Sequence, residues 1–224
     1  MKQNNKSLLK LIIIYLIYFS YTTVFSYSLK VFGISNEVVL IFISDLLFLI
    51  GISYLYKDTL KECFNKFIKV NSKKGLFILK WVAILFGINM LGGIITELLF
   101  PNLLEDGNTS VIYSIADNST LYIVFKALIF APIAESLVYQ KSIREVIKNN
   151  TLFIIVSSLI YALINIMYTD ITMLTIIDMI SYFVFSSILS YIYVKNDENI
   201  IYSMIIKFFY NLIPLILMIM SIGV

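Results

Sequence analysis

Histidine is absent from this sequence of 224 residues, and cysteine occurs once, at Cys63. Histidine is the side chain that most often transfers protons in enzymes, and it is a common metal ligand. A single thiol excludes an intramolecular disulfide and a thiolate cluster. The composition therefore predicts neither a metal site nor a cofactor.

Charged residues are also scarce. They make up 14% of the chain, whereas 60% of the residues are hydrophobic. Soluble domains contain about 25% charged residues, so a soluble fold of this composition would expose large apolar patches. The net charge of +3 is small, and we expect no nucleic-acid partner. These numbers indicate a protein embedded in a lipid bilayer.

The hydrophobic residues form runs of the length that a membrane-spanning helix needs, which is roughly 20 residues. Only helices and closed barrels satisfy their backbone hydrogen bonds in lipid, and runs of this length indicate helices. We expect an all-α fold, a polytopic transmembrane helix bundle of about seven spans that forms one membrane domain over residues 1–224. The expected spans are 8–28, 38–56, 76–100, 121–147, 152–169, 171–194 and 200–222.

The first run follows a polar, basic start, as the apolar part of a signal peptide does. However, it is long and rich in tyrosine, and no small-residue cleavage site follows it. We therefore interpret it as the first span.

The basic residues predict the orientation, because cytoplasmic loops are enriched in Lys and Arg. If the N-terminus is cytoplasmic, only Lys30, Lys126 and Lys207 fall outside the cytoplasmic segments. The opposite loop, residues 101–120, has no Lys or Arg but contains acidic residues. We therefore predict a cytoplasmic N-terminus and an outer C-terminus. The cytoplasmic segments are 1–10, 57–80, 141–150 and 195–199, and the acidic residues of the outer loop are Glu105, Asp106 and Asp117.

Segment 57–74 carries apolar residues at helical spacing among its charges, namely Leu60, Phe64, Phe67 and Ile68. Such a segment is either an amphipathic helix on the membrane surface or a solvated connecting helix. The sequence supports both interpretations equally.

Several polar side chains fall within the expected spans, where charges are costly and usually face the bundle interior. Each one alone is most simply explained as a contact between helices, so a functional site requires several of them to match one pattern. The charged candidates are Asp45, Glu97, Lys126, Glu135, Asp178 and Lys207, and the uncharged ones are Asn89, Gln140, Asn165 and Asn211.

Three stretches of the second half carry such a pattern. Residues 131–140 contain a proline followed by Glu135 and Ser136, with Gln140 four residues later. Residues 157–165 contain Tyr161-x-x-x-Asn165, and residues 207–211 contain Lys207-x-x-x-Asn211. In this order they resemble the three motifs of the CPBP family, the Abi or type II CAAX prenyl protease relatives, which include lysostaphin-resistance-A-like proteins. The resemblance covers a core of residues 121–215.

The resemblance implies a role for each position. Active members of the family have two adjacent glutamates and an arginine in the first motif. Glu135 keeps the first glutamate, which acts as the base, whereas Ser136 and Gln140 replace the second glutamate and the arginine.

The two remaining motifs are Phe-x-x-x-His and His-x-x-x-Asn in active members. Tyr161 stands at the phenylalanine position, and Asn165 replaces the histidine that helps to activate water. Lys207 replaces the second histidine, whereas Asn211 keeps the oxyanion asparagine. Because Asn165 cannot titrate, the usual proton transfer is lost. We expect Glu135, Asn165, Lys207 and Asn211 to converge as a remnant site, with Glu135 and Lys207 as a buried ion pair between the fourth and seventh spans.

The first functional hypothesis is a non-catalytic CPBP member, a pseudoprotease that binds a membrane protein or peptide. The family implies the roles of regulator, scaffold or bacteriocin-immunity factor, and a sequence rich in Ile, Lys, Asn and Tyr suggests the plasma membrane of a bacterium with an AT-rich genome. The second hypothesis is an active intramembrane endopeptidase, with Glu135 as the base and Lys207 and Asn211 as oxyanion donors. A small transporter is disfavoured, because no inverted repeat is visible.

Overall fold

The computed structural model describes residues 2–69, 73–101, 120–167 and 169–222, and these residues form helices without any strand. The helices, in order, are α1 (Lys2–Val31), α2 (Glu37–Leu55), α3 (Lys57–Lys69), α4 (Lys74–Leu99), η1 (Lys126–Lys141), α6 (Ser142–Val146), α7 (Asn150–Ile166), α8 (Met173–Lys195) and α9 (Ile200–Ile222). The outer loop that the sequence predicts at 101–120, with Glu105, Asp106 and Asp117, lies almost entirely outside the described residues. The all-α fold class is confirmed.

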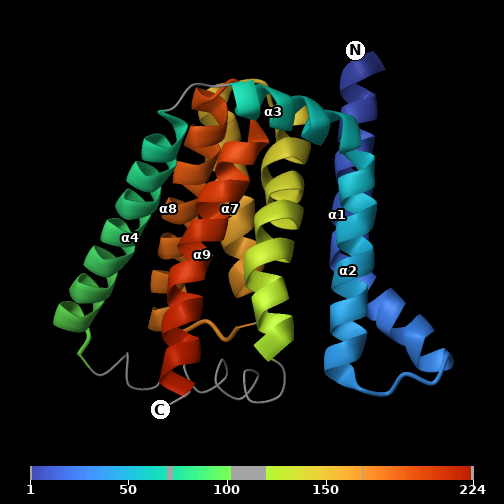
Figure 1. Ribbon diagram of the computed structural model, residues 1–224, viewed down its shortest axis with the longest axis horizontal. Coiled ribbons are helices and arrows are strands. Elements are labelled where there is room, and N and C mark those ends of the chain that lie inside the picture. The colour runs from blue at the N-terminus through green and yellow to red at the C-terminus, as the bar shows by residue number, and fades with distance from the viewer. Residues whose placement is uncertain (1, 70–72, 102–119, 168, 223–224) are drawn as a thin grey trace.

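Six helical segments are long and apolar enough to cross a membrane: Asn5–Val31, Glu37–Leu55, Lys74–Leu99, Thr120–Val146, Met173–Lys195 and Ile200–Met220. The remaining predicted span, residues 152–169, corresponds to α7, a shorter apolar helix of 17 residues. At 1.5 Å per residue it is about 25 Å long, which is close to the thickness of a bilayer core. Figure 1 shows the chain passing alternately up and down through these helices, so that its two ends lie at opposite ends of the bundle.

Polar side chains define where several helices begin. Asn36 and Asn149 cap α2 and α7, because their side-chain oxygens accept from the backbone N–H groups of Val39 and Leu152. Thr172 starts α8 with a capping box. A cap of this kind contributes about 1 kcal/mol. These caps separate apolar runs that otherwise follow one another closely.

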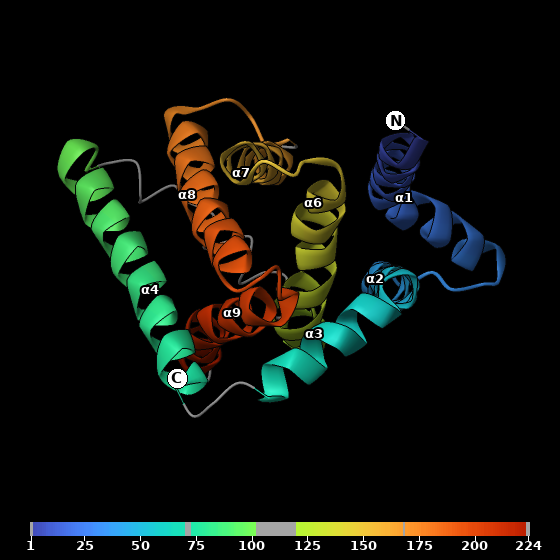
Figure 2. The same ribbon diagram turned by 90° about the horizontal axis from the view of Figure 1, so that it is seen from above.

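The amphipathic segment forms α3, which lies across one end of the bundle (Figures 1 and 2). Some of its apolar residues face the bundle, and others face away from it. Cys63 is buried, and Phe67 packs against Tyr202 of α9 with ring centroids 5.1 Å apart. Phe64 and Ile68 are more than half exposed. The helix therefore packs on the bundle with one side and presents a second, smaller apolar side outward.

Arg144 of α6 ties together the connections at the same end of the bundle. Its guanidinium donates to Glu198 at 2.8 Å, to the carbonyl of Lys148 at 2.7 Å and to the side chain of Asn150 at 2.7 Å. Arginine suits this task because its planar fork offers five donors. The connection between α6 and α7, the start of α7 and the turn between α8 and α9 are thus held by one buried side chain.

The N-terminal hairpin of α1 and α2 packs on η1 through aromatic residues. Tyr21 stacks on Phe48 at 4.6 Å, and Tyr18 meets Tyr139 edge-on at 5.6 Å. These residues share one hydrophobic cluster with Phe130, whereas α4 packs with α8 and α9 in a second cluster. The first 120 residues thus contribute to the packing around the CPBP-like motifs.

Candidate functional site

The first motif lies on η1, which is wound as a π-helix over residues 126–141. In a π-helix each N–H donates to the carbonyl five residues back, as the N–H of Ser142 does to Leu137. Pro132 within it has no N–H to donate. Residues five apart therefore share a face, and this winding places Glu135 and Gln140 on the same side of the helix.

Glu135 and Lys207 form an ion pair between η1 and α9. The Lys207 side chain is 5% exposed and that of Glu135 is 16% exposed. The ammonium group also donates to the hydroxyl of Tyr161 at 3.3 Å and lies 4.8 Å from the centroid of that ring. The ring of Phe185 lies 5.7 Å from it on another side. The buried ion pair that the sequence predicts is therefore present, with Tyr161 as its third member.

Asn211 contacts η1 as well, but at a different level. Its side-chain N–H donates to the backbone carbonyl of Ala127 at 2.8 Å. Lys207 and Asn211 thus lie on the face of α9 that packs on η1, as their four-residue spacing predicts. The amide group that would act as an oxyanion donor is already bonded to the protein backbone.

Asn165 does not join this cluster. Its side chain is exposed, and its N–H group donates to the carbonyl of Tyr161 in its own helix at 2.8 Å. The physical reason is local: Asn165 lies in the last turn of α7, where a short amide can bond to the preceding turn while the large ring of Tyr161 occupies the interior. The structure brings together Glu135, Tyr161 and Lys207 and leaves Asn165 outside.

Ser136 and Gln140 are both buried, with 3% exposure each. The side-chain oxygen of Gln140 has no hydrogen-bond partner among the described residues. Gln140 lines a cavity of approximately 10 Å³ together with Glu135, Tyr139, Tyr161, Phe185 and Lys207. A cavity of this size holds about one water molecule, and a peptide does not fit.

The side chains around the Glu135–Lys207 ion pair are poorly suited to hold a metal ion. In the described part of the chain, no three carboxylate or thiol side chains lie close enough together to hold a metal ion. The Glu135 carboxylate faces an ammonium group, which cannot ligate a metal.

A second ion pair, between a buried aspartate and a partly exposed lysine, connects the N-terminal hairpin to the motif-bearing half. Asp45 of α2 is fully buried and accepts from Lys126 of η1 at 2.7 Å. The hydroxyls of Tyr21 and Tyr122 donate to the same carboxylate at 2.5 and 3.0 Å. Sequence reasoning selected both charged residues but paired neither, and it missed the two tyrosines. The available signal is that Lys126 and Lys207 are the two lysines of the expected spans that fall outside the cytoplasmic segments.

The remaining charged candidates lie apart from both pairs. Glu97 is exposed in the last turn of α4, and Asp178 is half-buried on α8. Asn89 faces a separate cavity of approximately 130 Å³ between α4 and α8. None of the three contacts Glu135 or Lys207.

Comparison with known proteins supports the resemblance carried by the motifs. The family model described as type II CAAX prenyl endopeptidase Rce1-like matches residues 117–213, which include all of the motif positions discussed above. No curated protein and no solved structure gives a match. With the three motif stretches on η1, α7 and α9 in the family's order, residues 117–213 of this chain are similar to the CPBP family.

Proposed function

We propose that this protein is a non-catalytic member of the CPBP family that binds a membrane protein or a membrane-active peptide in the plasma membrane of a bacterium. It acts there as a regulator, a scaffold or an immunity factor against a bacteriocin. These roles rest on the family membership, and the loss of catalysis rests on the site.

The closed state of the site carries this proposal. A peptidase must bring a water molecule and a substrate carbonyl within about 3 Å of its catalytic groups. The cavity beside Glu135 has a volume of approximately 10 Å³, and an oxygen of the Glu135 carboxylate already accepts from Lys207. The site therefore lacks both the space for a substrate and a free base.

The two side-chain amides that would assist the base already form hydrogen bonds within the protein. Asn211 donates to Ala127 and Asn165 donates to Tyr161. An oxyanion hole depends on donors that point at the developing charge before the reaction begins. Here both amides stabilise the helices instead, which favours a structural use of the inherited motif.

The decisive experiment compares wild type with Glu135→Gln. Folded protein is measured by size-exclusion chromatography of detergent extracts, and proteolysis by profiling the N-terminal peptides of membrane proteins in cells that express each form. The proposal predicts that no peptide depends on Glu135 and that protection of a sensitive host from a bacteriocin, where present, follows the amount of folded protein. A peptide that appears with wild type and disappears with equally well folded Glu135→Gln would overturn it.

That second outcome would identify an intramembrane endopeptidase, the alternative that the retained Glu135 favours. Glu135 would then serve as the base, and Lys207 and Asn211 would donate to the oxyanion after the site opens. Removal of a general base costs about 10²–10⁴ in rate, so the cleavage product would fall below detection at a normal folded yield.

A further inference from the structure

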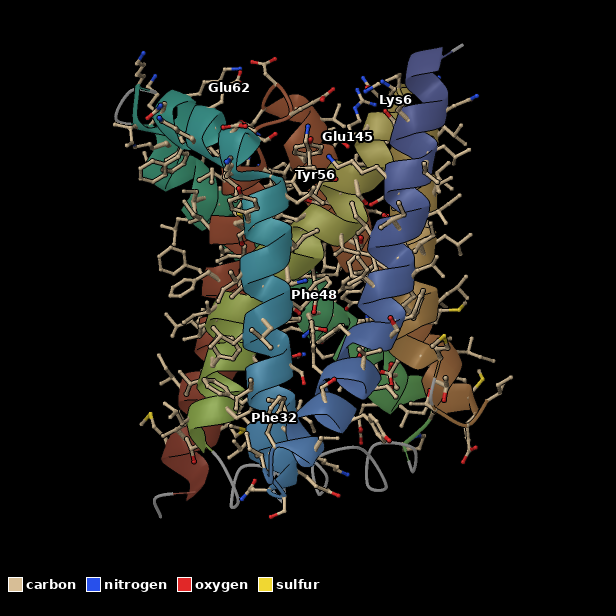
Figure 3. The ribbon with its side chains drawn as sticks, turned by 90° about the vertical axis from the view of Figure 1, so that its right-hand side faces the viewer. Lys6, Phe32, Phe48, Tyr56, Glu62 and Glu145 are labelled. Atoms are coloured by element: carbon tan, nitrogen blue, oxygen red, sulfur yellow. The ribbon has the colours of Figure 1, made fainter. Side chains whose placement is uncertain are left out.

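A cavity much larger than the one beside Glu135 lies between α1 and α2. Its volume is approximately 710 Å³. Figure 3 shows this side of the molecule, with Phe48 between the two helices and Lys6, Tyr56 and Glu145 towards one end. The walls are apolar along most of their length and are formed by residues such as Ile13, Ile17, Phe48, Gly51, Ile52 and Leu55. We call this cavity the α1–α2 groove.

The groove lies at membrane depth, because both of its walls are helices long and apolar enough to span the bilayer. Its rims are open: Ile13, Ile17 and Leu47 are 46%, 47% and 42% exposed. Apolar side chains at this depth face lipid tails rather than water. The occupant must therefore be a component of the membrane itself.

Polar groups are confined to one end of the groove, where Lys6 and Lys10 of α1 meet Tyr54 of α2. Lys10 pairs with Glu145 at 2.9 Å and lies 3.9 Å above the ring of Tyr56. Lys141 approaches the same Glu145 at 3.5 Å. One carboxylate is thus shared by two lysines, and this end carries excess positive charge.

Two further lysines strengthen that charge. Lys6 is exposed and forms no ion pair with any described residue. Lys57 lies 4.4 Å from the ring of Tyr54, at the same end. Basic groups at the mouth of a groove between spans attract the phosphate of an anionic lipid.

The volume and the lining of the groove favour a lipid over a partner helix as its occupant. A spanning helix of 20 residues, about 10 Å wide and 30 Å long, occupies roughly 2,400 Å³. The groove has less than a third of that volume. Helix partners in membranes are also held by small and polar residues along the interface, whereas Gly51 is the only small residue among the described residues that line the groove. A narrow apolar channel with ammonium groups at one end fits a lipid better.

We propose that the α1–α2 groove binds one anionic phospholipid, with an acyl chain along Ile13, Ile17 and Gly51 and its phosphate at Lys6 and Lys10. The site faces the leaflet on the N-terminal side of the bundle. It is separate from Glu135 and does not depend on the function proposed above.

Native mass spectrometry of the full-length protein tests the charge requirement. The protein is released from nanodiscs that contain phosphatidylglycerol or phosphatidylcholine, and the bound lipid is counted. We expect phosphatidylglycerol to be retained over phosphatidylcholine. The Lys6→Gln/Lys10→Gln variant should weaken this retention by roughly 30-fold, as expected for two lysines near an anionic headgroup. The control variant, Lys61→Gln/Lys69→Gln, removes two exposed charges of α3 and should retain the lipid.

A second variant tests the groove itself and leaves the ion pair of Lys10 with Glu145 intact. A Cβ atom at Gly51 would meet no atom within 4 Å, so the side chain of Gly51→Leu starts in open space and narrows the groove, and leucine suits a helix better than glycine. It should abolish lipid retention. Gly87→Leu on α4, where a Cβ atom would also meet nothing within 4 Å, is the matched control and should change nothing.

Equal retention of the two lipids by wild type would overturn the proposal, and so would unchanged phosphatidylglycerol retention in Gly51→Leu. A protein that co-purifies with wild type and is lost in Gly51→Leu, while lipid retention stays constant, would assign the groove to a partner helix and would also overturn it.

Discussion

At the scale of single residues, Lys207 determines the character of the site. A lysine in place of histidine supplies a permanent cation on a long stem, and that stem reaches Glu135 across the interface between η1 and α9. The pair was predictable from the sequence, because the motif positions place both residues in one site and a charge within a span needs a partner. The orientation of Asn165 was not predictable, because an amide near a helix end bonds equally well to its own backbone or to a neighbour.

Substitutions of this pair test its contribution to stability. Glu135→Gln and Lys207→Met should each lower the free energy of unfolding by about 3–5 kcal/mol, because each leaves one uncompensated buried charge. The double variant should recover most of the loss, since replacement of a whole buried pair by uncharged groups is often nearly neutral. Unfolding in mixed micelles, followed by circular dichroism, measures all four proteins.

The exposed ion pair of Glu62 and Lys66 on α3, at 2.6 Å, provides the control, and its removal should have little effect because water screens it. If the double variant is as unstable as the sum of the single variants, Glu135 and Lys207 contribute separately and the clamp between η1 and α9 is refuted.

At the scale of helices, α3 and α9 are joined by one amide group. Asn199 precedes α9 and is 5% exposed. Its oxygen accepts from the N–H of Ile201 at 3.1 Å, and its nitrogen donates to the carbonyl of Cys63 at 3.0 Å. The same side chain therefore caps α9 and holds α3 across the end of the bundle.

Substitution of Asn199 should release α3. Asn199→Ala removes both hydrogen bonds, and we expect the lone cysteine, now 7% exposed, to react with a maleimide at least several-fold faster. Asn149→Ala is the matched control, because it removes the cap of α7, at a similar cost of about 1 kcal/mol, without touching α3. Equal labelling of Cys63 in both variants would show that α3 is held by its apolar contacts alone.

The winding of η1 lay beyond what the sequence could predict. A helical period is read from alternation between apolar and polar faces, but η1 is buried on most sides, with Phe130, Ala134, Leu137 and Val138 all at 1% exposure or less. The division of the apolar face of α3 was not predictable either. Its spacing fits one apolar stripe, but in the structure Phe67 packs on Tyr202 of α9 whereas Phe64 and Ile68 stay exposed.

At the scale of the whole molecule, the number and order of the helices were largely predictable. Apolar length alone identifies the spans, and only α7 falls short of the usual length. The packing of α1 and α2 on η1 was not predictable, because an acid such as Asp45 has two lysines within the expected spans to choose from, and only the fold shows that Lys126 is the partner.

An odd number of passes puts the two ends of the chain on opposite sides of the membrane. Reporter fusions at Lys195 and after Val224 should therefore report opposite sides, with Lys195 cytoplasmic. A fusion at Gly33, in the turn between α1 and α2, should agree with the C-terminal one, because both lie at the same end of the bundle (Figure 1). The same side for Lys195 and Val224 would mean that α9 does not cross the membrane, whereas opposite sides for Gly33 and Val224 would mean that α7 does not cross it.

The ion pairs of Glu135 with Lys207 and of Asp45 with Lys126 have a consequence for the effect of a membrane voltage on the protein. One elementary charge moved through a potential of 100 mV gains or loses about 2.3 kcal/mol. Glu135 with Lys207, and Asp45 with Lys126, each sum to zero charge, so the electric field does no net work on either pair when its helices shift together. An energised membrane and a depolarised one should therefore affect these two junctions alike, whereas Glu135→Gln would leave Lys207 as an uncompensated charge and make the position of α9 sensitive to voltage.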